Sequence, residues 1–218
     1  HMATYPDVCA ALDALGCDTS RITVLIHQFV TVVRGGKVVK MSTRKANYVT
    51  LDELMDEAGV DATRYFFVMR RRGSHCEFDI ELATSQTLEN PVFYVQYAHA
   101  RICSIFRHAR ETCPEACDEF TSADVDAARL SEEQEQDLVR VLAQYGEVIE
   151  AAAESLEPHR VTNYLESVAE AFHRYYNTHQ IVVNDRETAR ARLALARVTR
   201  NVIRNGLRVL GVSAPETM

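Results

Sequence analysis

The stretch Gly35-Gly36-Lys37-Val38-Val39-Lys40-Met41-Ser42-Thr43-Arg44-Lys45 joins a predicted hairpin to a predicted helix. The glycine pair separates two short β-branched runs, Val30–Val33 and Val38–Val39, which predicts a tight turn between two strands. Downstream, Thr50-Leu51-Asp52-Glu53 has the spacing of a capping box and predicts a helix start. The loop between them combines cationic side chains, a hydroxyl and backbone N–H groups, which suits a phosphate. Taken by itself, a basic pentapeptide favours the simpler interpretation, a solvated surface loop.

Composition indicates a folded protein that does not span a membrane. Of the 218 residues, 47% are apolar, which is enough for a core, and no apolar run is long enough to cross a bilayer. Six cysteines over this length do not make a disulfide framework. Cys113-Pro114-Glu115-Ala116-Cys117 lacks a second pair of ligands for zinc, so no metal site is expected. Reduced cysteines lead us to expect a cytoplasmic protein.

Charge is distributed unevenly along the chain. The net charge is −7, which argues weakly against a nucleic-acid partner. Acidic residues dominate between Glu115 and Glu157, whereas the segment Arg186–Arg208 contains seven arginines and a single glutamate. A protein that is acidic overall can therefore still present one cationic face to RNA.

Helical periodicity accounts for most of the chain. One β-branched run, Ile22–Ile26, is predicted to be a buried parallel strand. Ser131-Glu132-Glu133-Gln134 is predicted to be a second capping-box start. The stretch Asp79–Arg110 is expected to be helical almost throughout, and Pro91 kinks or restarts it. The other expected helices are Tyr5–Gly16, Leu51–Ala58, Asp61–Arg70, Ser131–Gly146, Glu147–Leu156, Val161–Val183 and Arg186–Leu210.

The segment Asn90–His108 has two distinct faces on a helical wheel. One face carries the apolar side chains Val95, Ile102 and Phe106, which suffice for a core stripe. The opposite face carries Tyr94, Tyr97, Arg101, Ser104 and His108. Aromatic rings beside a guanidinium form a platform on which unpaired bases stack. Packing of the tyrosines against a neighbouring helix is the alternative, which these residues alone favour.

The last predicted helix carries an arginine stripe. Arg186, Arg190, Arg197, Arg200, Arg204 and Arg208 fall in one narrow sector of the wheel. Such a stripe suits the phosphate backbone of a nucleic acid. Pairing with the acidic helices between Ser131 and Glu157 is an equally open alternative.

Two motifs carry a family resemblance. Lys40-Met41-Ser42-Thr43-Arg44 resembles the KMSKS signature of class I aminoacyl-tRNA synthetases, and Asn90-Pro91-Val92-Phe93-Tyr94-Val95-Gln96-Tyr97-Ala98-His99-Ala100-Arg101 resembles the signature of the arginyl-tRNA synthetases. The resemblance runs from about Tyr5 to Met218 and covers only the back part of such an enzyme. It implies a mainly α fold: a remnant of a class I α/β nucleotide-binding domain over residues 1–78, then an all-α anticodon-binding helix bundle over residues 79–218.

The resemblance also implies roles for single residues. Lys40, Met41, Ser42, Thr43 and Arg44 would form the ATP-binding loop, with Lys40, Ser42 and Arg44 as the catalytic groups that stabilise charge at the α-phosphate. Thr43 stands where the common motif has its second lysine, so Arg44 or Lys45 would supply that charge. The residues expected to contact tRNA are Tyr94, Gln96, Tyr97, Arg101, Tyr175, Tyr176, Asn177 and Met218, together with Arg204 of the arginine stripe.

The implied reaction is the ligation of arginine to its tRNA with ATP and Mg as cofactors of the full-length enzyme. The other ATP motif of the family, His-x-Gly-His, does not occur in these 218 residues. We therefore expect the chain alone to be inactive and to hold no ATP. Its expected partner is tRNA for arginine, and a dimer through the apolar surface left by the missing half is a further expectation. The alternative is a free-standing helix bundle that makes protein contacts only.

Overall fold

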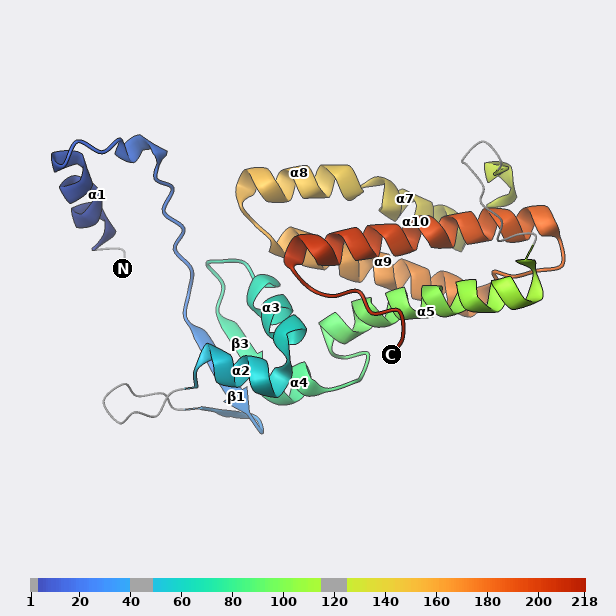
Figure 1. The fold of residues 1–218 in the computed structure, drawn as a ribbon, viewed down its shortest axis with the longest axis horizontal. Helices are drawn as coiled ribbons and strands as arrows, with labels where there is room; N and C mark the ends of the chain where they lie inside the picture. Colours follow the sequence, from blue (N-terminus) through green and yellow to red (C-terminus); the bar gives the residue numbers. More distant parts are fainter. Residues whose placement is uncertain (1–3, 40–48, 115–124) are drawn as a thin grey trace.

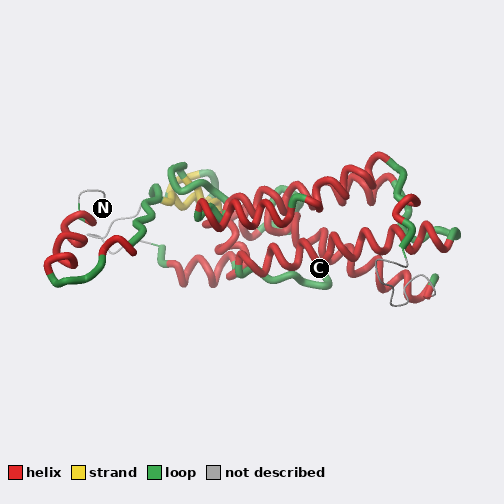
Figure 2. Tube along the Cα trace, turned by 90° about the horizontal axis from the view of Figure 1, so that it is seen from above, coloured by secondary structure: helices red, strands yellow, loops and turns green. Residues whose placement is uncertain are grey.

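The computed structural model describes residues 4–39, 49–114 and 125–218. Helices dominate these residues, and a small sheet lies at one end of the helical body (Figure 2). The chain therefore has the mainly α fold that the sequence predicts. The described helices and strands are, in order, α1 (Tyr5–Ala14), β1 (Val30–Arg34), β2 (Lys37–Val38), α2 (Leu51–Ala58), α3 (Val60–Val68), β3 (Cys76–Asp79), α4 (Ile80–Thr84), α5 (Pro91–Thr112), α7 (Glu133–Ala143), α8 (Tyr145–Ser155), α9 (His159–Thr178) and α10 (Arg186–Leu210), with short 3-10 turns at Thr19–Arg21 and Ala127–Arg129.

The sheet has the strand order β2-β1-β3. Strands β1 and β2 form the predicted antiparallel hairpin, and their turn is made by Gly35 and Gly36 at φ 57° and 70°. Positive φ at both central residues is the conformation that a two-residue hairpin turn requires, and glycine adopts it without strain. Strand β3 pairs with β1 in parallel, with Val30 opposite Cys76, after the chain has passed through α2 and α3. This third strand was not predicted from the sequence.

Helix ends follow the predicted capping chemistry. Thr50 and Glu53 form the expected capping box of α2, and Gly59 ends that helix. Helix α10 begins after Asp185, whose side chain accepts a hydrogen bond from the backbone of Thr188, and ends at Gly211. The capping box of α7 is shifted by one residue from the prediction, since Glu132 rather than Ser131 caps the helix.

One predicted element, the strand Ile22–Ile26, is wrong. Residues 22–26 form no strand, and Ile22, Val24, Leu25 and Ile26 are 39–46% exposed. Among the described residues no further strand lies beside this segment, so its backbone has no ladder to join. Helix α1, at the far end of this extended segment, stands apart from the rest of the molecule (Figure 1). The stretch 79–110 is divided as predicted: α4 ends at Thr84, and a new helix, α5, starts at Pro91.

Helices α5, α7, α8, α9 and α10 form a bundle around one apolar core (Figure 1). Helix α9 packs against the other four, and its Leu165, Phe172 and Tyr175 are fully buried. A Cβ on Gly206 of α10 would lie 2.6 Å from Leu165, so a glycine is what allows α9 and α10 to approach each other. Within the described residues, no helix is both long enough and apolar enough to cross a membrane.

Candidate nucleic-acid interface

The predicted ATP loop lies outside the described residues. This applies to Lys40, Met41, Ser42, Thr43 and Arg44, whose catalytic and ATP-binding roles stay predictions. The elements on either side of the loop are defined: Val39 donates its backbone N–H to Val32 (2.9 Å), and α2 begins directly after Thr50. The described residues include no group of three or more His, Cys, Asp or Glu side chains arranged to hold a metal ion.

A row of near-parallel rings runs across α5 and α9. The ring centroids of Phe93 and Tyr97 are 6.0 Å apart with an interplanar angle of 10°, and those of Tyr97 and His173 are 5.7 Å apart at 24°. Tyr94 contacts the same histidine at 4.9 Å. We call Phe93, Tyr97, His173, Arg101 and Tyr176 the aromatic row. Ring faces spaced in this way offer stacking surfaces to unpaired bases.

Arg101 lies between two tyrosines. Its guanidinium carbon is 5.3 Å from the ring centroid of Tyr97 and 5.3 Å from that of Tyr176, and Nη2 donates to the Tyr97 hydroxyl. That hydrogen bond raises the pKa of Arg101, so the side chain stays cationic. Burial lowers the pKa of His173, which keeps its imidazole neutral near pH 7. The row therefore combines neutral π faces with one fixed positive charge.

The row borders a cavity of about 700 Å³ between α5, α9 and the segment that follows α9. Three of the predicted tRNA-contacting residues, Arg101, Tyr176 and Asn177, line this cavity. Its other polar walls come from Ser104, His108, His179 and Gln180. Side-chain donors and acceptors of this kind can read the edges of a nucleobase. The sequence did not single out His173, His179 or Phe93, because their part in the site depends on the packing of α5 against α9.

Two predicted contact residues are buried instead. Tyr175 is 0% exposed in the bundle core, one position before the accessible Tyr176. Gln96 is 8% exposed, and its Nε2 donates to Asp61 (2.9 Å) and to the carbonyl of Ser213 (3.0 Å). Neither side chain has a surface to offer RNA, so we do not retain them as contacts. Gln96 holds the C-terminal residues in place.

The segment after α10 packs along α5 as an ordered tail. The Ser213 amide donates to Asp61 of α3 (3.0 Å), His99 Nδ1 hydrogen-bonds the carbonyl of Pro215 (2.8 Å), and Arg107 donates to the carbonyl of Glu216 (3.2 Å). These bonds carry Met218, which is 55% exposed, to a cavity that Phe93 also lines. Met218 and Phe93 thus line one cavity, and the tRNA-binding role of Met218 stays a prediction.

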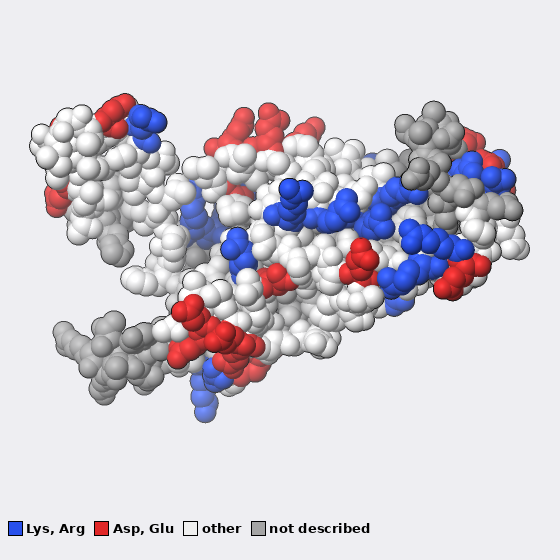
Figure 3. All heavy atoms as spheres, viewed as in Figure 1, with Lys and Arg blue, Asp and Glu red and all other residues white. Residues whose placement is uncertain are grey.

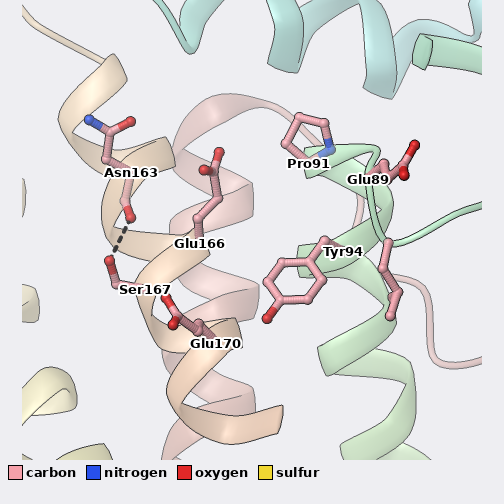
Figure 4. Close-up of a pocket in the computed structure, with 8 residues that line it drawn as sticks. Glu89, Pro91, Tyr94, Asn163, Glu166, Ser167 and Glu170 are labelled. Atoms are coloured by element: carbon pink, nitrogen blue, oxygen red, sulfur yellow. Dashed lines mark hydrogen bonds between the residues drawn. The ribbon is translucent and has the colours of Figure 1, made fainter. Parts of the chain in front are cut away.

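An acidic pocket of about 380 Å³ marks the other end of the row. Figure 4 shows Tyr94 facing α9 across this pocket, with Glu89, Glu166 and Glu170 around it. Burial raises the pKa of Glu166, which accepts a hydrogen bond from Tyr65 (3.1 Å). Carboxylates repel phosphates but accept hydrogen bonds from base amino groups. A nucleic-acid strand on the row would therefore direct its phosphates toward Arg101.

The arginine stripe lies along the exposed edge of α10 (Figure 3). Arg204 and Arg208 are exposed, and Arg200 stacks over Phe106 with its guanidinium carbon 4.9 Å from the ring centroid. An ion pair does join α10 to the acidic helix α7, but it uses Arg192, which binds Glu135 at 2.7 Å and is not part of the stripe. Arg192, an arginine that the wheel did not select, thus makes an ion pair between α10 and α7.

Comparison with known proteins identifies a family. The model of the DALR anticodon binding domain matches residues 95–218. An arginine–tRNA ligase of Salinibacter ruber is 49% identical over 219 residues, and that of Desulfotalea psychrophila is 46% identical over 221. Each alignment covers 100% of this chain but only 38% and 39% of those proteins. The chain thus spans less than two fifths of the length of these curated relatives and matches their C-terminal part.

Solved structures with a similar fold carry the same family name as the curated relatives. A Campylobacter jejuni protein assigned as an arginyl-tRNA synthetase has a TM-score of 0.81 and is 26% identical in sequence. The match covers 98% of this chain and 45% of that protein. The Thermus thermophilus arginyl-tRNA synthetase has a TM-score of 0.68 at 24% identity, covering 86% and 34%, and shows the shared fold. Nothing in these matches supports a free-standing protein-interaction module. The chain belongs to the DALR anticodon binding domain family and, within it, to the arginyl-tRNA synthetases, whose C-terminal region it matches.

Proposed function

We propose that this chain binds the anticodon loop of tRNA for arginine on the aromatic row. The observation that carries the proposal is the Arg101 guanidinium placed 5.3 Å from two tyrosine rings, next to the near-parallel faces of Phe93, Tyr97 and His173. Stacking suits unpaired bases, and the cation neutralises a neighbouring phosphate. Asn177 and the cavity beside it supply hydrogen bonds to a base edge, and Met218 adds an apolar contact near Phe93.

The proposal is tested with Tyr97→Ala in a filter-binding titration against tRNA for arginine. Loss of one stacking ring should weaken binding by about 1–3 kcal/mol. Tyr5→Ala is the matched control, since Tyr5 is an exposed tyrosine of α1, which stands apart from the bundle. Equal affinity of Tyr97→Ala and the wild type would remove the aromatic row from the interface.

For the whole protein we propose the ligation of arginine to its tRNA with ATP and Mg, as the names of the curated relatives imply for those proteins. The residues of this chain that would act on ATP are Lys40, Ser42 and Arg44, at the start of the segment before α2. A cationic loop there would stabilise charge on the departing pyrophosphate. Lys40→Ala in the full-length protein should reduce ATP–pyrophosphate exchange, and unchanged exchange would contradict this role.

Self-association of the chain is a separate proposal. The exposed apolar side chains of residues 22–26 form an unpaired extended segment beside Phe29, which is 82% exposed. Burial of such a surface between two copies would remove it from water. We therefore expect a concentration-dependent dimer in sedimentation velocity. A Leu25→Asp variant should be monomeric, and a monomeric wild type would refute the proposal.

A further inference from the structure

The C-terminal tail, residues 213–218, lies along one strip of helix α5 (Figure 1). The residues of the strip are three or four positions apart and are therefore neighbours on one helix face: Gln96, His99, Cys103 and Arg107. Three of them bind the tail. Gln96 Nε2 donates to the carbonyl of Ser213 (3.0 Å). His99 Nδ1 donates to the carbonyl of Pro215 (2.8 Å), and Arg107 donates to that of Glu216 (3.2 Å). Cys103, the fourth member, lies between two residues that hold the tail.

Cys103 is shielded while the tail is in place. It is 5% exposed, and its Sγ lies 3.9 Å from Nδ1 of His99. Burial raises the pKa of the Cys103 thiol, and the negative charge of Glu216 on the tail raises this pKa as well. Because the thiolate rather than the thiol is the nucleophile, Cys103 is unreactive in this closed arrangement.

The groups that favour a thiolate stay on the helices when the tail leaves. Burial is the largest influence on the pKa of Cys103, and Arg200 of α10 and Arg107 of α5 lower that pKa against it. Departure of the tail admits water to the sulfur and removes Glu216, so both influences that raise the pKa are lost together. The two arginines remain. An electropositive and partly exposed environment is the one in which cysteines react.

His99 is a second, independent feature beside the sulfur. It is 2% exposed, and its buried Nε2 has no hydrogen-bond partner. Burial lowers the pKa of His99, and Arg200 and Arg204 of α10 lower it as well, so the imidazole is neutral near pH 7. A neutral imidazole four positions from a cysteine on one helix face can take the proton of the thiol.

The tail can open while the bundle stays folded. Ser213 and the last three residues of the chain are exposed, whereas Val212, just before them, is buried in the core. A segment held mainly by hydrogen bonds at the surface opens locally at a lower free energy than the core unfolds. Opening of residues 213–218 would uncover the strip of α5 that contains Cys103.

We propose that Cys103 is a modification site gated by the C-terminal tail, where a small disulfide forms a mixed disulfide with the protein when residues 213–218 leave α5. His99 takes the thiol proton, and the sulfur of Cys103 attacks one sulfur of the disulfide. A new S–S bond forms to Cys103 as the S–S bond of the small disulfide breaks, and its other half leaves as a thiolate. Cys103 is oxidised, and the departing half of the disulfide is reduced.

The adduct should hold the tail open. Cys103 is buried in a close-packed interior when the tail is closed, which leaves no room for an attached second thiol. A modified Cys103 therefore keeps the tail from closing, and Met218 leaves the cavity that it lines together with Phe93. An effect of this opening on tRNA binding rests on the proposed function, whereas the gate itself does not.

The test is the rate at which each thiol of the 218-residue chain reacts with the aromatic disulfide dithiobis-nitrobenzoate. Released thiolate is followed by absorbance, and modified positions are assigned by peptide mass spectrometry. All samples carry four further changes that leave two cysteines: Cys9→Ser, Cys17→Ser, Cys113→Ser and Cys117→Ser. Cys76 is the matched control thiol, because it is also buried but lies on β3, where its Sγ contacts the carbonyl of Phe66.

Two variants open the gate. Asp61→Ala removes the carboxylate that accepts hydrogen bonds from the amide and the hydroxyl of Ser213. Loss of these two bonds should raise the fraction of open tail, and with it the rate at Cys103, roughly 150-fold. Deletion of residues 213–218 should give a rate at least as high, and Cys76 should keep its wild-type rate in both variants. The proposal is overturned if neither variant speeds the reaction of Cys103, or if Cys76 accelerates by the same factor, because global unfolding would then control access.

Amide hydrogen exchange of residues 211–218 tests whether the adduct holds the tail open. Exchange in the modified chain should be as fast as in Asp61→Ala, and a Cys103→Ser chain treated with the same reagent should keep its protection. Full protection of the tail in the modified chain would overturn this part of the proposal. A modified chain with an open tail and an unchanged affinity for tRNA would support the gate and contradict the role proposed for Met218.

Discussion

Replacement of Asp61 by alanine should release the C-terminal tail. Asp61 accepts three hydrogen bonds: from the Ser213 amide (3.0 Å), from the Ser213 hydroxyl, and from Gln96 Nε2 (2.9 Å). A hydrogen bond to a charged group contributes about 1.5–3 kcal/mol net. Ser213 is exposed, so the lower end of that range applies to its two bonds, and buried Gln96 loses a partner as well. We expect the tail to be destabilised by about 3–5 kcal/mol in total.

The assay is amide hydrogen exchange of the peptide that covers residues 211–218. A loss of about 3 kcal/mol corresponds to an exchange that is roughly 150-fold faster in this peptide, while the bundle core keeps its protection. Binding of tRNA should weaken in parallel, because Met218 is no longer held beside Phe93. Asp56→Ala is the matched control, since Asp56 is an exposed carboxylate of nearby α2. Unchanged exchange in Asp61→Ala, or an equal change in the control, would refute the reasoning.

Three further predictions concern the bundle. Glu135→Leu leaves the Arg192 guanidinium without its carboxylate partner and should lower the free energy of unfolding in urea by about 3–5 kcal/mol. The double variant Glu135→Leu/Arg192→Leu should lose less stability than the two single variants added together. Additive losses would contradict the buried ion pair. Gly206→Ala should destabilise by about 1–3 kcal/mol, because its Cβ would lie 2.6 Å from Leu165, and a gain in stability would contradict that contact. Burial lowers the pKa of His99 below the 6.5 that it would have unfolded, so the unfolded chain binds more protons and stability falls as the pH drops from about 7.5 to about 5.5. His99→Gln should flatten this pH dependence of the urea midpoint, and an unchanged pH dependence would exclude His99 as a source.

Local signals predicted the helix ends and the hairpin. The ends of α10 at Asp185 and Gly211, the capping box at Thr50, and the turn at Gly35 each depend on residues within a few positions of one another. The apolar face of α5 was also predictable, since its 3.6-residue periodicity separates core from surface. Strand β3 was missed because four residues are too few for an alternating pattern, and its partner β1 lies far away in sequence.

The candidate site was predictable only in part. The wheel placed Tyr94, Tyr97 and Arg101 on one accessible face, and α9 then supplied His173 and Tyr176 opposite them. Tyr175 stands three residues after Phe172 and seven after Val168, which is the spacing of one helix face, so its burial could have been foreseen from the sequence. Burial of Gln96 was not foreseeable, because its partner Ser213 is 117 positions away along the chain.

The central claim is that the chain recognises the anticodon loop of tRNA for arginine through the aromatic row. It is tested most directly by filter binding of the wild-type chain to this tRNA and to the same tRNA with a substituted anticodon, at two salt concentrations. We predict tighter binding of the unaltered tRNA at both concentrations, with both affinities falling as salt rises because phosphates contribute to each. Equal affinity for the two tRNAs would contradict anticodon recognition by this chain.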